Sequence, residues 1–174
     1  SPVKVAYDLE NEDPRIRAMY GDHIGGQSML LARRLIEAGV PVVQVNAGAG
    51  DLSGGNGDNW DTHRDHFGKM KKRLLPVFDR SISALLTDLQ QRGLLEETLV
   101  VWASEMGRTP FKNGSMTKNP GRDHNSHGLV MWMAGGDVKG GATAGETDEF
   151  GLRSKDEPIP LRNVHATILD LMGL

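Results

Sequence analysis

The residue types that could bind a metal ion gather in two short segments of the sequence. Asp61 and His63 lie two residues apart, and Asp123 and His124 are adjacent. A carboxylate and an imidazole at such spacing can bind the same divalent cation, since both supply ligand atoms that borderline metals accept. An aspartate that caps a helix beside a surface histidine would explain the first pair as well. The spacing alone leaves both interpretations open.

Glu105 adds a third carboxylate, directly after the apolar run Thr98–Ala103. A carboxylate at the end of a buried strand is rarely needed for packing, which makes it a candidate ligand. The residues therefore predict a divalent metal site that is formed by Asp61, His63, Glu105 and His124. Zn²⁺ suits this mixture of nitrogen and oxygen atoms, and Mn²⁺, Mg²⁺ or Ca²⁺ would suit ligation dominated by carboxylates.

Two arginines and one aspartate are predicted to support catalysis around this site. Arg108 and Arg122 can hold an anion by forked hydrogen bonds, which suits a phosphate or sulfate oxyanion. Asp123 would orient the ring of His124 from behind the metal. The alternative for the two arginines is a salt bridge to Glu105 or to Asp123.

Four further polar residues have two interpretations each. Ser104 and Thr109 carry hydroxyl groups near the predicted metal site and could act as nucleophiles, but both residue types are common at strand ends and in turns. His66 could be a ligand, although we expect it at the surface. His127 either supports a metal ligand or faces solvent.

The segments that must position these residues alternate between helix and strand patterns. The predicted elements are a helix over 27–38, a buried strand over 40–46, a helix capped by Asp61 that ends at Gly93 and is kinked or divided at Pro76, and a strand over 98–103. Strand, helix and strand form a parallel crossover unit, whose strands end at one edge of the sheet. Asp61 and Glu105 follow those two strands, so we expect them to meet at this edge.

The other segments are predicted to be shorter or irregular. Pro14 should begin a short helix, and the glycine-rich stretch 47–59 should form a loop. Residues 104–127 contain turn residues only. A strand over 129–134 is expected either to return antiparallel to the strand before it or to pair through a long excursion. A tight turn over 135–141 and a closing helix over 161–174 complete the chain.

The composition limits the classes of function. The 174 residues suit one domain, and 38% hydrophobic with 25% charged residues is ordinary for a globular protein. A net charge of -3 argues against nucleic acid or an anionic membrane surface as the main partner. No apolar stretch approaches the roughly 20 residues of a membrane-spanning helix. The absence of cysteine excludes thiolate metal ligands and a cysteine nucleophile.

Several motifs, in order, resemble one bacterial family. They are WDTH at 60–63, LLTDLQQRGLLEETLVV at 85–101, SEMGRTP at 104–110, GRDHN at 121–125, MAGGDVKGG at 133–141 and VHATILDLMGL at 164–174. They look like the C-terminal half of a family of sulfatase-like proteins, usually exported and of unassigned function, in the alkaline-phosphatase superfamily. By this resemblance, Asp61 and His63 match the metal-binding segment, Glu105 the acidic ligand after the next strand, and His124 the histidine that follows.

The resemblance implies a fold and a reaction. The fold would be an αβα sandwich with a mixed, mainly parallel sheet, and one or two divalent metals would support hydrolysis of sulfate or phosphate esters. No motif here matches the family's nucleophile, which would lie on a strand before Ser1, so residues 1–174 are expected to be the C-terminal portion of one domain. The functional expectation is a metal-dependent hydrolase that takes an anionic ester substrate. The alternative is a non-catalytic exported binding or scaffold module with the same fold.

Overall fold

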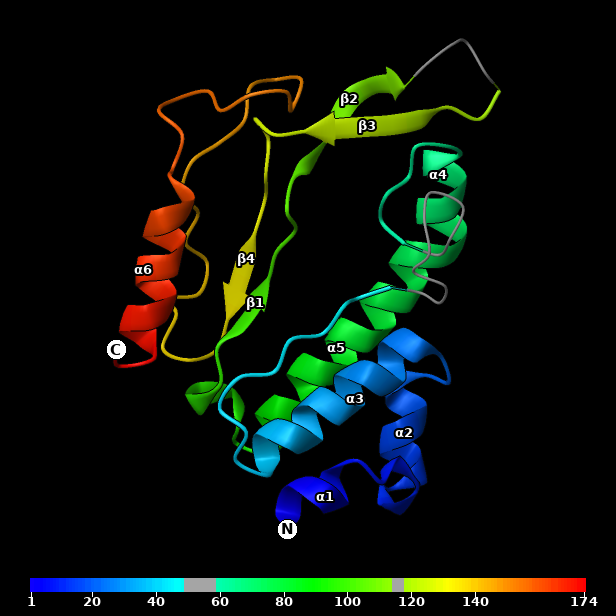
Figure 1. Cartoon of the computed structure of the whole chain (residues 1–174), viewed down its shortest axis with the longest axis vertical. Coiled ribbons are helices and arrows are strands. Elements are labelled where there is room, and N and C mark those ends of the chain that lie inside the picture. The colour runs from blue at the N-terminus through cyan, green and yellow to red at the C-terminus, as the bar shows by residue number, and fades with distance from the viewer. Residues whose placement is uncertain (49–58, 114–117) are drawn as a thin grey trace. The chain divides into compact units, whose positions relative to one another are not determined.

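The computed structural model describes residues 1–48, 59–113 and 118–174 (Figure 1). The chain divides into two compact units, the first formed by residues 1–94 with 114–121 and the second by residues 95–113 with 122–174. Most of the glycine-rich loop predicted over 47–59 lies outside the described residues. No helix among the described residues is long and apolar enough to cross a membrane.

The first unit is helical. Its elements are α1 (Pro2–Ala6), a 3₁₀ turn (Leu9–Asn11), α2 (Pro14–Tyr20), α3 (Ile24–Glu37), α4 (His66–Lys69), a π-helical turn (Met70–Leu74) and α5 (Leu75–Gln91). α2 begins at Pro14 as predicted, because proline has the backbone angle of a first helical residue and needs no hydrogen-bond acceptor there. α3 confirms the helix predicted over 27–38.

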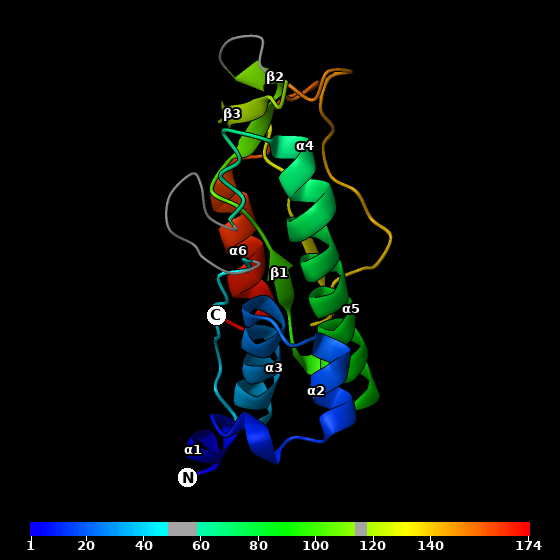
Figure 2. The same ribbon diagram turned by 90° about the vertical axis from the view of Figure 1, so that its right-hand side faces the viewer.

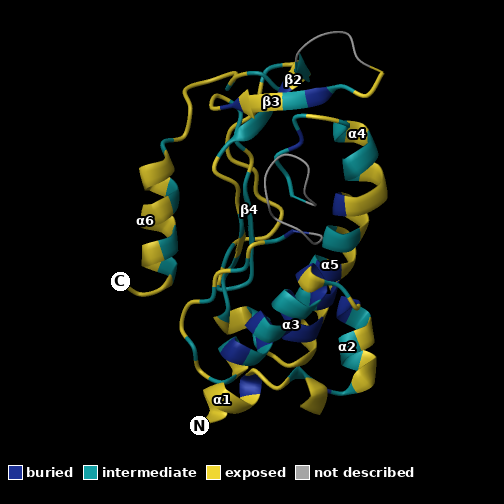
Figure 3. Ribbon diagram, turned by 45° about the vertical axis from the view of Figure 1, so that its right-hand side comes forward, coloured by how far each residue is buried: buried dark blue, intermediate teal, exposed yellow. Residues whose placement is uncertain are grey.

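The hydrophobic core of the first unit lies where α3 packs against α5 and α2 (Figures 2 and 3). Tyr20, Met29, Leu30 and Ala84 form its buried centre. Met29 and Leu30 belong to the apolar stripe that predicted α3, and burying one such side chain stabilises the fold by about 2 kcal/mol.

Charged residues are buried in the same core. Arg33 is only 1% exposed and forms ion pairs with Glu12, with Glu37 and with Asp88, whose Oδ2 lies 2.7 Å from Nε of Arg33. The Tyr20 hydroxyl donates a hydrogen bond of 3.0 Å to the same Asp88 oxygen. These residues connect three segments that are distant in sequence, so the network selects one packing of the helices.

Two more arginines complete this network. Arg92 contacts Asp88 at 2.7 Å and Glu37 at 2.9 Å, and Arg34 contacts Glu12 at 2.8 Å. Burial alone would raise the pKa of Glu12, but hydrogen bonds from Arg34 and Arg33 outweigh it, so the pKa lies below the usual 4.5. Burial and the neighbouring Asp88 carboxylate raise the pKa of Tyr20.

Pro76 divides the long helix as predicted. The α-helical pattern is replaced by a π-helical turn over Met70–Leu74, and α5 then starts with proline in its first turn. Proline cannot donate the backbone hydrogen bond of a helix interior, and its ring clashes with the carbonyl one turn earlier, which favours a wider turn there. The predicted cap is wrong, because the residue at the N-terminal cap of α4 is Asp65 rather than Asp61.

The strand predicted over 40–46 is absent, since these residues are irregular and pair with no strand among the residues that the structure describes. Val45 packs on the helical core, whereas Val42 is 66% exposed. Residues with high β-propensity form a strand only where a neighbouring strand accepts their hydrogen bonds. The predicted parallel crossover unit is therefore wrong.

The second unit contains the strands. β1 (Val100–Trp102) pairs with β4 (Trp132–Ala134), β2 (Gly107–Asn113) pairs with β3 (Gly121–Asn125), and α6 (Leu161–Leu171) follows. β1 and β4 are antiparallel, with Val101 opposite Met133, which confirms the predicted antiparallel return. The rings of Trp102 and Trp132 stack with their centroids 6.4 Å apart.

The fold class expected from the resemblance is wrong. In the described residues, the strands form two small antiparallel sheets of two strands each, not the mainly parallel sheet of an αβα sandwich. The expectation of turn residues alone over 104–127 is also wrong, because β2 and β3 lie there. Their polar sequence lacks the alternation of apolar residues by which strands are predicted.

Candidate metal centre

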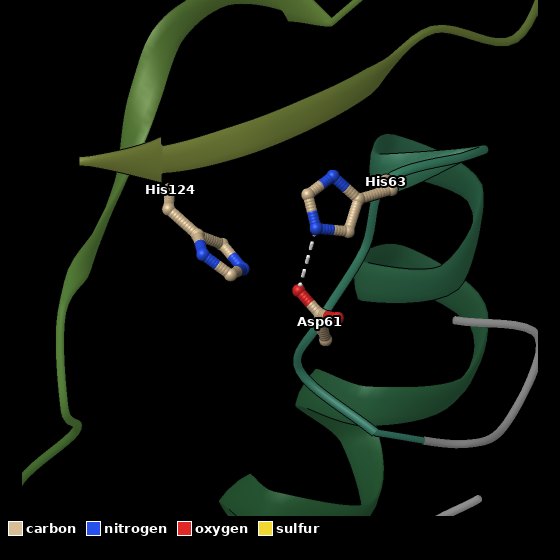
Figure 4. A group of neighbouring side chains, drawn as sticks. All are labelled: Asp61, His63 and His124. Atoms are coloured by element: carbon tan, nitrogen blue, oxygen red, sulfur yellow. Dashed lines mark ion pairs between the residues drawn. The ribbon is translucent and has the colours of Figure 1, made fainter. Parts of the chain in front are cut away.

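Asp61 and His63 face each other in the first unit (Figure 4). Oδ1 of Asp61 lies 3.0 Å from Nε2 of His63, and both side chains are partly exposed. Two ligand atoms of a tetrahedral zinc ion, each about 2.1 Å from the metal, lie about 3.4 Å apart. The pair therefore has nearly the spacing that one bound ion requires, and its nitrogen and oxygen atoms suit Zn²⁺.

Buried contacts on either side hold this segment in place. Thr62 is fully buried, and its hydroxyl lies 2.6 Å from Nδ1 of His66. Trp60 donates its ring N–H to the carbonyl of Ala47 and meets Phe78 edge to face at 5.8 Å. Because Thr62 points into the protein, its two neighbours in the sequence are left at the surface as a pair.

His66 is not part of the ligand pair. The sequence suggested a surface residue, but the structure places its ring against Thr62, at the start of α4. The contact joins His66 to the ligand segment, and the four-residue spacing from Thr62 is the signal that sequence reasoning missed.

The start of β3 is joined to the Asp61–His63 segment by backbone contacts in the first unit. Arg64 forms a β-bridge with Pro120, and the backbone N–H of His66 donates to the Pro120 carbonyl at 3.1 Å. A Cβ atom at Gly121 would lie 1.9 Å from the carbonyl oxygen of His63. Only glycine allows this approach, which ties the WDTH and GRDHN segments together.

His124 lies three residues further along β3, on the part of the strand that belongs to the second unit. Asp61, His63 and His124 are candidate metal ligands, since each carries one suitable ligand atom. Glu105 does not belong to this group among the described residues. It is exposed, and it accepts a hydrogen bond of 3.4 Å from the Ser104 hydroxyl.

The remaining predicted residues lie in the second unit. Arg108 and Arg122 are partly buried on β2 and β3. The Asp123 carboxylate accepts the backbone N–H of His124 at 2.8 Å, a contact with the main chain rather than the ring. Thr109 accepts the backbone N–H of Asp123 at 3.1 Å and donates to the Phe111 carbonyl at 3.0 Å. Its hydroxyl thus holds the strands together, which accounts for it without a nucleophilic role.

Two other polar residues are also accounted for. The Ser104 hydroxyl donates to the Met106 carbonyl at 2.9 Å. His127 is exposed, and its backbone N–H donates to the Asn125 side chain at 3.1 Å. Ser104 follows the end of β1 and its hydroxyl contacts the main chain, which agrees with its interpretation as a structural residue. His127 lies at the surface.

Comparison with known proteins corrects the resemblance drawn from the motifs. A family model described as "Protein of unknown function (DUF1501)" matches residues 1–174. No sulfatase or alkaline-phosphatase family model matches, so the identification with the sulfatase-like family is wrong. No curated protein and no solved structure matches the chain.

Proposed function

The chain belongs to the DUF1501 family, and we propose that it contributes a divalent metal site to a hydrolase of phosphate or sulfate esters. The observation that carries this proposal is the facing pair of Asp61 and His63, 3.0 Å apart. A carboxylate and an imidazole that converge on one point at the surface favour cation binding over a packing role.

His124 is the third ligand in this proposal. Its imidazole supplies a nitrogen atom of the kind that Zn²⁺ accepts as a ligand. Glu105 is the further candidate, and water or substrate would complete the coordination. A bound Zn²⁺ would polarise the ester oxygen and lower the pKa of a bound water.

The chain's own residues would orient the substrate and control metal binding. Arg108 and Arg122 would hold the oxyanion of the ester through their guanidinium groups. A histidine binds metal only as the neutral imidazole, so protons and the metal ion compete for the same nitrogen atom.

Zinc binding by the full chain tests the metal site. We expect close to one Zn²⁺ per chain by elemental analysis, and at least about tenfold weaker binding in Asp61→Ala, His63→Ala and His124→Ala. His165→Ala is the matched control, since His165 is exposed on α6 and lies outside the candidate group. Equal affinity in Asp61→Ala and the control would overturn the metal site.

Ester turnover tests the hydrolase. We expect release of p-nitrophenol from p-nitrophenyl phosphate or p-nitrophenyl sulfate with Zn²⁺, and loss of this release with chelator or in His63→Ala. If the chain binds stoichiometric Zn²⁺ but turns over neither ester, the proposed hydrolase activity is wrong. The metal site would stand, and the result would favour a binding module.

A further inference from the structure

Three cationic side chains share one face of the β2–β3 sheet. Side chains alternate along a strand, so Arg108 and Lys112 point to one side of β2. The buried residues of the two strands, Thr109, Gly121 and Asn125, all lie at the alternate positions, which also include the exposed Phe111 and Asp123. Arg122 lies between Gly121 and Asp123, so its side chain points to the opposite side of β3 from theirs. We call Arg108, Lys112 and Arg122 the cationic face.

Lys112 is the unusual member of the cationic face. Its Nζ atom is buried, and it has no hydrogen-bond partner among the residues that the structure describes. A buried ammonium group without a partner is unfavourable, because it has lost water and gained nothing in return. Such a group is expected where a ligand brings the missing negative charge.

The local acidic residue does not occupy this face. Asp123 is adjacent to Arg122 in β3, so its side chain points to the opposite face of the sheet, where its carboxylate accepts the backbone N–H of His124. Each guanidinium carries five N–H donors, so Arg108 and Arg122 can keep contacts within the protein and still offer donors to a ligand. The cationic face therefore combines two forked donors with one compact charge.

We propose that the cationic face binds the doubly charged phosphate group of a phosphate monoester. Three positive charges complement a dianion better than the single charge of a sulfate monoester. The proposal names the substrate class of the site above. It rests on that proposed function for the reaction, but the binding of the anion requires no metal.

Binding of phenyl phosphate and phenyl sulfate to the full chain in the presence of chelator tests the proposal. At pH 8 we expect phenyl phosphate to bind about tenfold tighter than phenyl sulfate. At pH 5 this preference should vanish, because a phosphate monoester has a second pKa near 6 and carries one charge below it. A lack of preference at pH 8 would overturn the proposal.

Lys112→Met removes the ammonium charge but keeps a long apolar side chain that can pack in the same place. The variant should bind phenyl phosphate about tenfold more weakly and lose the preference over phenyl sulfate. Its melting temperature should equal or exceed that of the parent, since no partner loses a contact. Lys139→Met, in the exposed turn after β4, is the matched control and should bind like the parent. Binding by Lys112→Met equal to this control would overturn the role of Lys112.

The proposed function and this inference fail in distinguishable ways. If the chain binds phenyl phosphate but no Zn²⁺, the proposed metal site is wrong. The cationic face then stands as a phosphate-binding surface. The opposite result is zinc-dependent turnover of p-nitrophenyl sulfate alone, with no binding of phenyl phosphate in the presence of chelator. It would support the proposed hydrolase and overturn the proposal for the cationic face.

Discussion

The Nε atom of Arg33 lies 2.7 Å from Oδ2 of Asp88, and both side chains are almost fully removed from solvent. The N–H is not aligned for a hydrogen bond, so the contact is an ion pair. Removal of one partner from a buried ion pair leaves an uncompensated charge, which costs more than the intact pair contributes.

Asp88→Asn should lower the free energy of unfolding by about 3 kcal/mol, because the neutral amide no longer compensates Arg33 and Arg92. Urea denaturation measures this change. Asp79→Asn is the matched control, since Asp79 is exposed on the same helix, and it should change stability by less than about 0.5 kcal/mol. Equal effects of the two substitutions would show that the buried network contributes nothing specific.

The stability of the protein should fall in acid, with Glu12 as one cause. Its pKa in the folded state lies below the usual 4.5, so its stabilisation is present above about pH 4.5 and is lost as the pH falls through the lower, folded pKa. Glu12→Gln should be less stable at pH 7 and should lose less stability between pH 5 and pH 3. Denaturation at each pH measures both, and an unchanged acid dependence would contradict the assignment.

Gly121→Ala should disturb the segment that carries Asp61 and His63. Its methyl group would collide with the His63 carbonyl, so we expect a loss of stability of about 2 kcal/mol or more and weaker Zn²⁺ binding. At Gly140 no atom lies within 4 Å of an added Cβ, so Gly140→Ala should affect neither. Thermal unfolding and a zinc titration of both variants provide the comparison.

Thr62→Val tests the positioning role of the threonine. The change keeps the shape but removes the hydroxyl that contacts Nδ1 of His66, which should cost about 1 kcal/mol in stability. If this contact orients the ligand segment, Zn²⁺ affinity falls as well. Thr167→Val on α6 removes an exposed hydroxyl and should leave Zn²⁺ affinity unchanged. Unchanged affinity in Thr62→Val would limit the residue to a structural role.

The helices were predictable because their signals are local. The apolar spacing of α3, the proline of α2 and the break at Pro76 all act within a few turns of chain. The strand over 40–46 was not, because an extended apolar run becomes a strand only if the fold supplies a partner. The strands β2 and β3 were not predicted for the opposite reason. Their polar sequences do not resemble strands, although each strand has a partner in the fold.

The types of the candidate ligands could be predicted from the sequence, but the contacts that hold their segment in place could not. Asp61, His63 and His124 could be selected from chemistry and spacing alone, whereas the contact of Gly121 with His63 joins segments distant in sequence. The buried network had a visible signal, because Arg33 lies one turn after Met29 and therefore on the apolar stripe of α3. A charged residue on such a stripe indicates a buried partner.

The stacked pair Trp102 and Trp132 makes the second unit optically distinct. The chain has three tryptophans, and the third, Trp60, lies edge to face with Phe78 in the first unit. Two nearly parallel indoles at this separation couple their electronic transitions, so their near-ultraviolet circular dichroism should report on the β1–β4 register. Fluorescence of Trp60 in a Trp102→Phe, Trp132→Phe background would report on the ligand segment. Each unit thus carries its own intrinsic chromophore.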